Sequence, residues 1–385
     1  MKLAKRIAQL PAYLFADLDK KKQAAIARGM DVISLSIGDP DLPTPELIVR
    51  AAEKAVADPA NHSYPAYAGS KAFREACAKW MERRFGHRFD ADKEVLGLIG
   101  SKEGIAHLPL ALVDPGDVVL CPQPGYPVYA IATRLVGGEV FEMPLLAKNG
   151  FLPDLDAIPT EVADKAKLLW INYPNNPTGA VAGLDFFERV VDFCRAHDIV
   201  LCSDNAYSEM CFDDYRAPSV FDVPGAREVA IEFHSMSKTY NMTGWRVGFL
   251  AGRADVVEPF RDLKSNLDSG PFSAVQVAAM EAMARGEALV PDLCEIYKGR
   301  RDVLVAGLRR AGFEPFVPQA TFYVWMPVPG GDDQAFAGRL VDELGVIVTP
   351  GSGFGSAGAG YVRFSLTVDE ARLEEAVKRI ESLSA

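Results

Sequence analysis

The chain has 385 residues, of which 49% are hydrophobic and 24% are charged, the balance typical of soluble globular proteins. This composition excludes wholesale disorder, collagen-like repeats and a coiled-coil rod, and the length suggests about two or three domains. The formal net charge of −11 disfavours a broad nucleic-acid face and an anionic membrane surface, which both attract positive charge. We therefore expect small molecules or other protein subunits as partners, with no nucleic acid and no membrane.

The absence of several sequence patterns excludes further classes of protein. The six cysteines form no C-x-x-C pair, and Cys121 and Cys202 stand in apolar runs, which predicts reduced thiols and a cytoplasmic location. Charges interrupt the N-terminal segment, so we expect no targeting signal, and no run reaches the about 18 apolar residues that a membrane helix needs. The five histidines show no H-E-x-x-H and no zinc-type spacing, so we expect no metal.

The first part of the chain predicts an arm and then a large α/β domain. Residues 1–45 contain too few apolar residues for a core of their own, so we expect an N-terminal arm and part of a small domain. From 46 to 285 we expect a large domain, because short apolar runs alternate there with helical segments such as 102–113 and 184–197. This alternation is typical of a mostly parallel sheet buried on both faces. The predicted strands are 95–99, 117–121, 167–172, 199–203, 229–233 and 246–250.

After residue 285 the pattern changes to that of a smaller α+β domain, which we place at 286–385. Helices and strands alternate at shorter spacing, and the last helix follows Thr367 and Glu370, which have capping-box spacing. The predicted elements before that helix are helices 296–311 and 333–344 and strands 321–326, 346–349 and 361–366.

Polar clusters follow four of the predicted strands in the large domain. Ligands of open α/β sheets bind beyond the carboxyl ends of the strands, so these clusters indicate one binding site at one sheet edge. The clusters are GSKEG (100–104), YPNNPTG (173–179), DNAY (204–207) and HSMSK (234–238).

Each cluster alone also has an ordinary structural interpretation. GSKEG is either a plain helix start or an anion site at a helix N-terminus, and NNPTG is by itself a good turn. Asp204 suits a helix cap, and most lysines like Lys238 lie on the surface. However, Lys238 stands among hydroxyl side chains near Arg246, which suggests phosphate or Schiff-base chemistry. We interpret the glycine-rich GSGFG (351–355) as a structural loop.

Together these segments resemble a known family. SMSKTY (235–240) with GWRVG (244–248) resembles the lysine motif of the class I/II pyridoxal-phosphate-dependent aminotransferases, which have fold type I. The resemblance covers nearly the whole chain and implies pyridoxal 5′-phosphate as cofactor, a large domain with a mostly parallel central sheet, and a smaller α+β domain. Further matches, in the family's order, are Tyr64 with Gly69, NPTG (176–179), Asp204 with Tyr207, and Arg363 in RFS.

A narrower resemblance concerns the substrate. Five segments are similar to the LL-diaminopimelate aminotransferase branch, which implies amino-group transfer between LL-diaminopimelate and 2-oxoglutarate in lysine biosynthesis. A broader alanine, aspartate or aromatic aminotransferase and a carbon–sulfur lyase on the same scaffold stay open. A non-enzymatic regulator is disfavoured by the negative charge and the intact lysine–aspartate–arginine set. The five segments are PAYLF (11–15), IGDPDLPTP (37–45), GSKEGI (100–105), FHSMSKTYNM (233–242) and KSNLDSG (264–270).

The resemblance also implies roles for individual residues in catalysis. Lys238 is expected to attach the cofactor and then to move the substrate proton, and Asp204 to pair with the pyridine nitrogen. Tyr207 and Asn176 are expected to donate to the phenolic oxygen of the ring, and Tyr126 to stack on the ring face.

The remaining roles concern the phosphate and the substrate, and they imply a homodimer with shared active sites. The residues expected to hold the phosphate are Ser101, the Lys102 amide, Ser235, Ser237, Arg246 and Tyr64 of the neighbouring subunit. Arg363 and the Gly38 backbone are expected to bind the α-carboxylate. The residues expected around the rest of the substrate are Tyr13, Lys102, Tyr126, Asn176 and Asn266.

Overall fold

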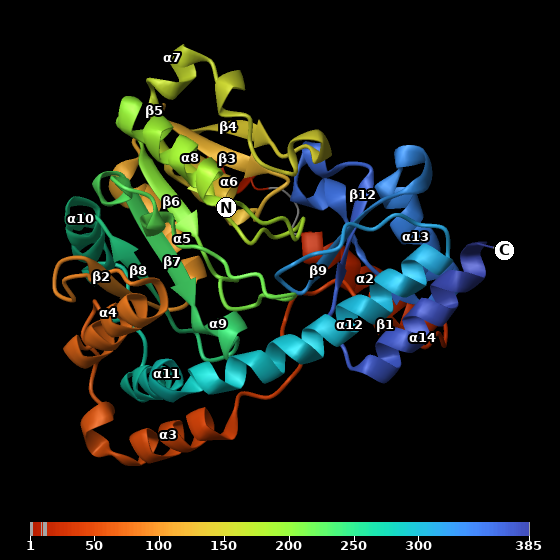
Figure 1. The fold of residues 1–385 in the computed structure, drawn as a ribbon, viewed down its shortest axis with the longest axis horizontal. Coiled ribbons are helices and arrows are strands. Elements are labelled where there is room, and N and C mark those ends of the chain that lie inside the picture. Colours follow the sequence, from red (N-terminus) through yellow and green to blue (C-terminus); the bar gives the residue numbers. More distant parts are fainter. Residues whose placement is uncertain (1–2, 9, 11–13, 385) are drawn as a thin grey trace.

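The computed structural model describes residues 3–8, 10 and 14–384, and a seven-stranded sheet lies at its centre (Figure 1). Strand β8 is antiparallel to both of its neighbours, β2 and β7, while all other neighbouring strands are parallel. The carboxyl ends of β2, β5, β6 and β7 therefore share one edge. In spatial order the strands are β2 (Val95–Leu98), β8 (Gly248–Gly252), β7 (Ala230–Ser235), β6 (Val200–Asp204), β5 (Ala166–Ile171), β3 (Val118–Gln123) and β4 (Glu139–Pro144).

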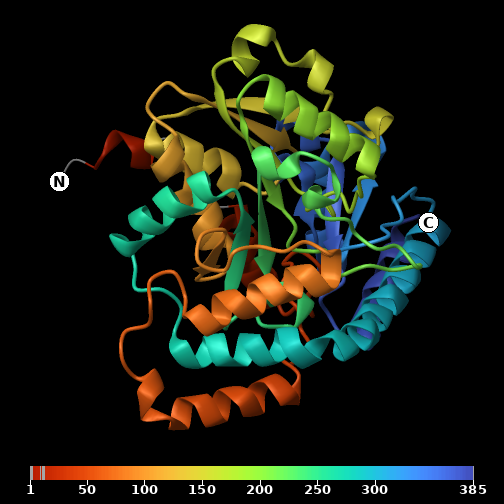
Figure 2. The ribbon, with the colours of Figure 1, turned by 60° about the vertical axis from the view of Figure 1, so that its left-hand side comes forward.

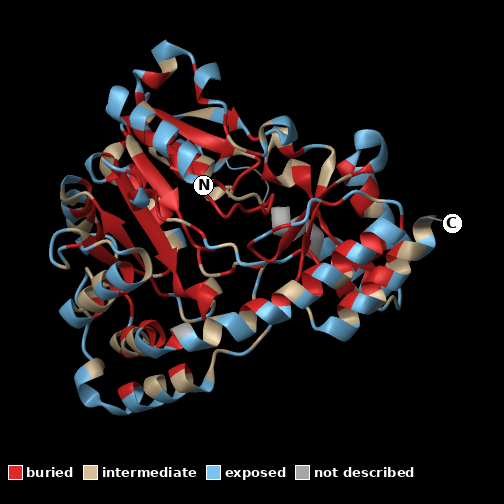
Figure 3. Cartoon of the chain, in the orientation of Figure 1, coloured by how far each residue is buried: buried red, intermediate tan, exposed pale blue. Residues whose placement is uncertain are grey.

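The two faces of this sheet carry separate apolar cores. Alternate residues of β5 show the division, because Trp170 packs with one core and Ile171 with the other. Figure 3 shows the strands buried and the outer helix faces exposed. The helices on the Trp170 side are α5 (Ser101–Leu112), α6 (Val128–Val136) and α10 (Ala254–Ser265). Those on the Ile171 side are α4 (Lys71–Phe85), α8 (Leu184–Ala196) and α11 (Ser273–Arg285).

The other helices near the large sheet are peripheral or short. Helix α11 lies between α4 and α3 (Glu46–Ala57) (Figure 2). The short helices are α7 (Thr160–Ala163) and α9 (Met236–Thr239), and the N-terminal segment forms α1 (Lys5–Ala8) and α2 (Leu14–Ala27). Within the described residues, no helix combines the length and the apolar character that crossing a bilayer requires.

A third core joins the beginning and the end of the chain. Ile33 and Leu35 pack in the same cluster as Phe364 and Leu373. The strands here are β1 (Ile33–Ser34) parallel to β10 (Val346–Ile347), and the antiparallel set β11 (Thr349–Pro350), β12 (Tyr361–Ser365) and β9 (Tyr323–Pro327). The helices are α12 (Val290–Arg310), α13 (Asp333–Leu344) and α14 (Glu370–Glu381).

Three local predictions need correction. Strand β4 was missed because it is an edge strand with mostly exposed or half-exposed residues, so it lacks a continuous apolar run. The predicted strand 346–349 is two short strands that belong to different sheets. Helix α14 is capped by Asp369, which accepts from the Arg372 amide at 3.0 Å, because the Thr367 hydroxyl instead donates to the Ile37 carbonyl at 2.7 Å.

Candidate active site

A cavity of about 410 Å³ lies at the sheet edge where the polar clusters follow their strands, within the usual size of a small-molecule site. Residues near the ends of β2, β5, β6 and β7 line it together with Gly38, Tyr323, Phe354 and Arg363. The predicted site residues in its wall are Gly38, Ser101, Lys102, Tyr126, Asn176, Asp204, Tyr207, Ser235, Ser237, Lys238, Arg246 and Arg363.

The charge of this cavity is opposite to that of the whole chain. Its wall carries the cationic side chains of Lys102, Lys238, Arg246 and Arg363, against two carboxyl groups, those of Asp39 and Asp204. A concave site with an excess of positive charge attracts anions. The cavity is therefore suited to ligands that carry carboxylate or phosphate groups, although the formal net charge of the chain is −11.

Lys238 stands on α9, immediately after β7, and its Nζ donates to the Gly38 carbonyl at 3.0 Å. Burial lowers the pKa of Lys238 to about 8, although nearby Asp39 opposes this shift. An appreciable share of the amine is then neutral near neutral pH, as a nucleophile or base requires. Glycine is needed at position 38, because a Cβ there would lie 1.9 Å from the Tyr323 hydroxyl.

Asp204, the last residue of β6, is buried with one carboxylate oxygen engaged and the other open. Oδ2 accepts from the Tyr129 hydroxyl at 2.6 Å, and Oδ1 has no hydrogen-bond partner within the described part of the chain. Burial raises the pKa of Asp204 to about 6, against the lowering effect of the Tyr129 hydrogen bond. A buried polar atom without a partner is costly. Oδ1 therefore suits a ligand group that donates a hydrogen bond to it.

Arg363 on β12 is a buried arginine without an ion-pair partner among the residues that the structure describes. It donates to Asn176 Oδ1 at 2.8 Å and to the Ser36 carbonyl at 2.5 Å, and its Nε has no partner within the described residues. Its guanidinium lies 4.1 Å from the ring centre of Tyr323 and 4.7 Å from that of Phe354. Burial lowers the pKa of Arg363. A buried guanidinium held by neutral groups is well suited to a ligand carboxylate.

Hydroxyl groups, a guanidinium and a helix N-terminus gather at the other end of the cavity. Ser101 begins α5 directly after Gly100, whose missing Cβ would lie 2.3 Å from Arg246 Nη2. Arg246 also donates from Nη1 to the Thr243 carbonyl at 2.7 Å and to Ser237 Oγ at 3.5 Å. Backbone amides of a helix start together with arginine form a suitable site for a phosphate group.

Among the residues missed from the sequence are Tyr323 and Phe354, which line the cavity, and Tyr129, which does not line it but bonds to Asp204. Tyr129 lies in the first turn of α6, and its ring centre is 5.7 Å from that of Tyr126, which precedes the helix. Tyr323, whose hydroxyl lies 3.1 Å from that of Tyr207, carried no signal beyond its place in an apolar run. Phe354 belongs to the loop interpreted as purely structural; the loop does pack tightly, but it also brings Phe354 into the cavity wall.

Two predicted site residues that the structure describes, Tyr64 and Asn266, do not line this cavity. Tyr13 lies outside the described residues. Tyr64 is 91% exposed, and Asn266 is an exposed C-cap of α10 that donates to the Asp262 carbonyl at 2.9 Å. The roles expected of Tyr64 and Asn266 depend on a neighbouring subunit, and they stay predictions.

Comparison with known proteins gives a consistent result. The family model "Aminotransferase class I and II" matches residues 30–380. LL-diaminopimelate aminotransferase of Desulforudis audaxviator is 57% identical over 98% of this chain and 96% of its own length, and that of Syntrophobacter fumaroxidans is 53% identical over 99% and 98%. The substrate-bound structure of BacF from Bacillus subtilis superposes with a TM-score of 0.95 at 35% identity, covering 100% of this chain and 98% of that one.

Proposed function

The chain belongs to the class I and II aminotransferase family, and on that premise we propose that its cavity transfers an amino group between LL-diaminopimelate and 2-oxoglutarate, with pyridoxal 5′-phosphate as cofactor. The observation that carries this proposal is the pairing, within one cavity, of buried Arg363 without an ion-pair partner among the described residues and Lys238 with a lowered pKa. The first suits an α-carboxylate, and the second suits proton transfer at the neighbouring carbon.

The described residues fit this cofactor. Asp204 offers a buried oxygen without a partner among the described residues for a protonated ring nitrogen, and the Gly100 turn brings the start of α5 against Arg246, a set of donors suited to a phosphate group. When bound, the cofactor supplies a carbonyl group that takes up the amine and a ring that withdraws electrons from the substrate Cα. Tyr126 lines the cavity as a candidate to cover the ring face, and Tyr207 with Asn176 as donors to the phenolic oxygen.

The protein groups then perform three tasks. Lys238 would hold the cofactor and, as a free amine, would move the proton between the substrate Cα and the cofactor's C4′, because its amine is largely neutral at mildly alkaline pH. Asp204 stays ionised above about pH 6 and keeps the ring nitrogen protonated. Ser235, Ser237 and Arg246, with Ser101 and the Lys102 amide at the start of α5, hold the phosphate.

Different residues recognise the two ends of the substrate. Arg363 binds the α-carboxylate through its planar fork, helped by the Gly38 backbone. The distal end of diaminopimelate carries both an amine and a carboxylate, which an uncharged amide such as Asn266 suits better than an arginine does. We assign Lys102 and Tyr13 to the same end.

The proposal includes a homodimer, because Tyr64 and Asn266 do not line the cavity of their own chain and are proposed to contribute to that of a partner. Exposed large side chains gather on the two segments that carry them, with Tyr64 91%, Tyr67 49%, Leu267 46% and Phe272 44% exposed. Such an exposed patch is typical of a protein interface.

All six cysteines are unpaired thiols, which supports a cytoplasmic enzyme.

The experiment is a donor comparison with the purified protein and added pyridoxal phosphate. LL-diaminopimelate, alanine, aspartate and phenylalanine are offered with 2-oxoglutarate, and glutamate formation is measured. Diaminopimelate should have much the highest kcat/KM, and Lys238→Ala should abolish turnover while the matched, exposed Lys148→Ala keeps it. A higher kcat/KM for another donor would overturn the substrate assignment and leave the family intact. Pyruvate and sulfide release from cystathionine without an oxo acid would instead indicate a carbon–sulfur lyase.

A further inference from the structure

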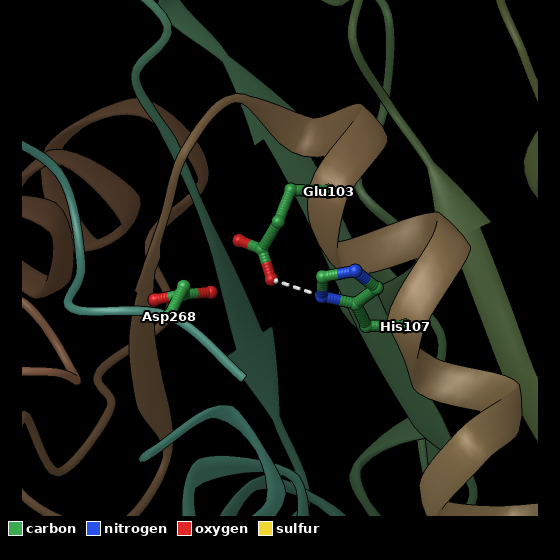
Figure 4. Close-up of side chains that lie close together, drawn as sticks. All are labelled: Glu103, His107 and Asp268. Carbon is green, nitrogen blue, oxygen red and sulfur yellow. Dashed lines mark hydrogen bonds and ion pairs between the residues drawn. The ribbon is translucent and has the colours of Figure 1, made fainter. Parts of the chain in front are cut away.

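A buried ion-pair cluster joins α5 to the end of α10, outside the cavity. The Lys264 side chain is fully buried, and its Nζ lies 3.0 Å from Glu103 Oε2 and 2.8 Å from Asp268 Oδ2. Glu103 Oε1 also bonds to His107 Nδ1 at 3.0 Å, and Figure 4 shows Glu103 between His107 and Asp268. Although ligand atoms of these three residues lie within 4.8 Å of one another, the Lys264 ammonium already bridges the two carboxylates, so we describe an ion-pair cluster.

One side of this cluster holds the wall of the cavity. Glu103 follows Ser101 and Lys102 in the first turn of α5, and both of these residues line the cavity. Glu103 Oε2 also accepts from the Ile99 amide at 3.1 Å, just before the Gly100 turn. The position of this turn, where we propose that the phosphate binds, therefore depends on Glu103.

The Asp268 side of the cluster fixes the segments that carry Asn266 and Tyr64, which do not line the cavity. Asp268 Oδ1 accepts from the Gly270 amide at 2.7 Å and so shapes the loop that begins at Asn266. Gly270 packs against the segment that carries Tyr64, since a Cβ there would lie 2.6 Å from the Ala66 carbonyl. Buried Gln276 joins the same two segments, accepting from the Ser70 amide and donating to the Pro271 carbonyl, both at 2.7 Å.

We propose that Lys264 is a positioning residue that couples the two active sites of the dimer. Through Glu103 it sets the phosphate-binding turn of its own subunit, and through Asp268 it sets the Asn266 and Tyr64 segments that complete the partner's cavity. This inference rests on the proposed shared-site homodimer. A buried ion pair is rarely better for stability than an apolar pair. However, one ammonium that bridges two carboxylates fixes both the distance and the orientation between the start of α5 and the end of α10.

Mixed dimers made from two differently tagged full-length chains test this coupling. One subunit carries Lys238→Ala, so that all turnover comes from the other, live cavity. Lys264→Met is then placed in the inactive subunit only, where it can affect the live cavity solely through the segments presented across the interface. We measure KM for LL-diaminopimelate, and the dissociation constant of pyridoxal phosphate from the visible absorbance that the Lys238-bearing cavity gives.

We expect KM and the cofactor dissociation constant of the live cavity to rise, KM by about tenfold, which is less than the about 100-fold that a 1 Å misplacement can cost. Lys298→Met, which removes the lysine of a partly exposed pair on α12, is the matched control and should change neither constant. Unchanged constants with Lys264→Met in the inactive subunit would overturn the proposal, since a merely structural lysine harms only its own subunit.

Two further variants keep the outcome interpretable. Tyr64→Phe in the inactive subunit should also weaken cofactor binding at the live cavity; if it does not, the shared-site dimer of the proposed function is wrong, whatever Lys264 does. Asp268→Asn preserves size and the pair between Lys264 and Glu103, and should act in the same direction with a smaller change. If neither Lys264→Met nor Asp268→Asn forms dimers while Lys298→Met does, the cluster is required for folding and the positioning role is overturned.

Discussion

Asp204 on β6 and Glu232 on β7 are buried carboxyl groups on neighbouring strands, yet their surroundings are opposite. Both oxygens of Glu232 have two partners each, with Oε1 bonded to Ser219 and His234 and Oε2 to Ser203 and the Val220 amide. Asp204 has one oxygen bonded to Tyr129, and the other is open in the part of the chain that the structure describes.

The pKa values of Asp204 and Glu232 shift in opposite directions. Burial acts to raise both, but at Glu232 the hydrogen bond to His234 and the other donors more than offset it, so the pKa of Glu232 is lowered. At Asp204 burial prevails and the pKa rises to about 6. An acid that only supports the fold is saturated with hydrogen bonds, whereas an acid kept for a ligand retains an open oxygen and a charge that is costly until the ligand arrives.

The largest expected effect comes from Asp204→Asn. The amide keeps the size and the bond to Tyr129 but cannot hold a ring nitrogen protonated, so kcat should fall by about 100-fold or more. Because the folded pKa of Asp204 lies above the unfolded value, the ionised side chain destabilises the cofactor-free protein above pH 6. Asp204→Asn should therefore raise its free energy of unfolding at pH 8 by about 1–2 kcal/mol. Urea unfolding and steady-state kinetics measure both, and a less stable variant would contradict our account of the open oxygen.

Glu232→Gln should have the opposite effects to Asp204→Asn, with lower stability and nearly unchanged kcat. It weakens four hydrogen bonds without touching the cavity, so the free energy of unfolding should fall by about 2 kcal/mol, while kcat stays near that of the parent. Urea unfolding at fixed protein and cofactor concentration checks this, with exposed Glu188→Gln on α8 as the matched control. A large loss of kcat in a folded Glu232→Gln protein would abolish the distinction between the two carboxyl groups.

Tyr129→Phe should have the smallest effect and should make Asp204 more like an isolated buried acid. Protonated Asp204 cannot pair with a protonated ring nitrogen, so pyridoxal phosphate binding should weaken as the pH falls through about 6. Losing the Tyr129 donor raises the pKa further and should move this transition upward by about one pH unit. Titration of cofactor affinity against pH measures the shift, and a transition that stays in place or moves downward would mean that Tyr129 does not stabilise the ionised form.

Local patterns of the chain were enough to predict much of the fold and the sheet edge at which four polar clusters meet. Continuous apolar runs predicted the inner strands β5, β6 and β7, because strands covered on both faces need no polar alternation. The polar residues that follow these strands were expected at one edge, and the parallel order of β2, β5, β6 and β7 brings Ser101, Asn176, Asp204 and Lys238 to one cavity. The catalytic roles of these side chains remain predictions.

Only the tertiary structure decided the contacts between distant segments. The bond between Tyr129 and Asp204 joins residues 75 positions apart, and the pair of Lys264 and Glu103 joins residues 161 positions apart. Strand β1 pairs with β10 near the opposite end of the chain, and the same packing brings Tyr323 and Phe354 against Arg363. Apolar periodicity and turn residues report on neighbours within a few positions of one chain, so they determined the elements and their polar ends. Long-range hydrogen bonds and ion pairs depend on how complete elements pack, and that packing decided which acid was saturated and which was left open.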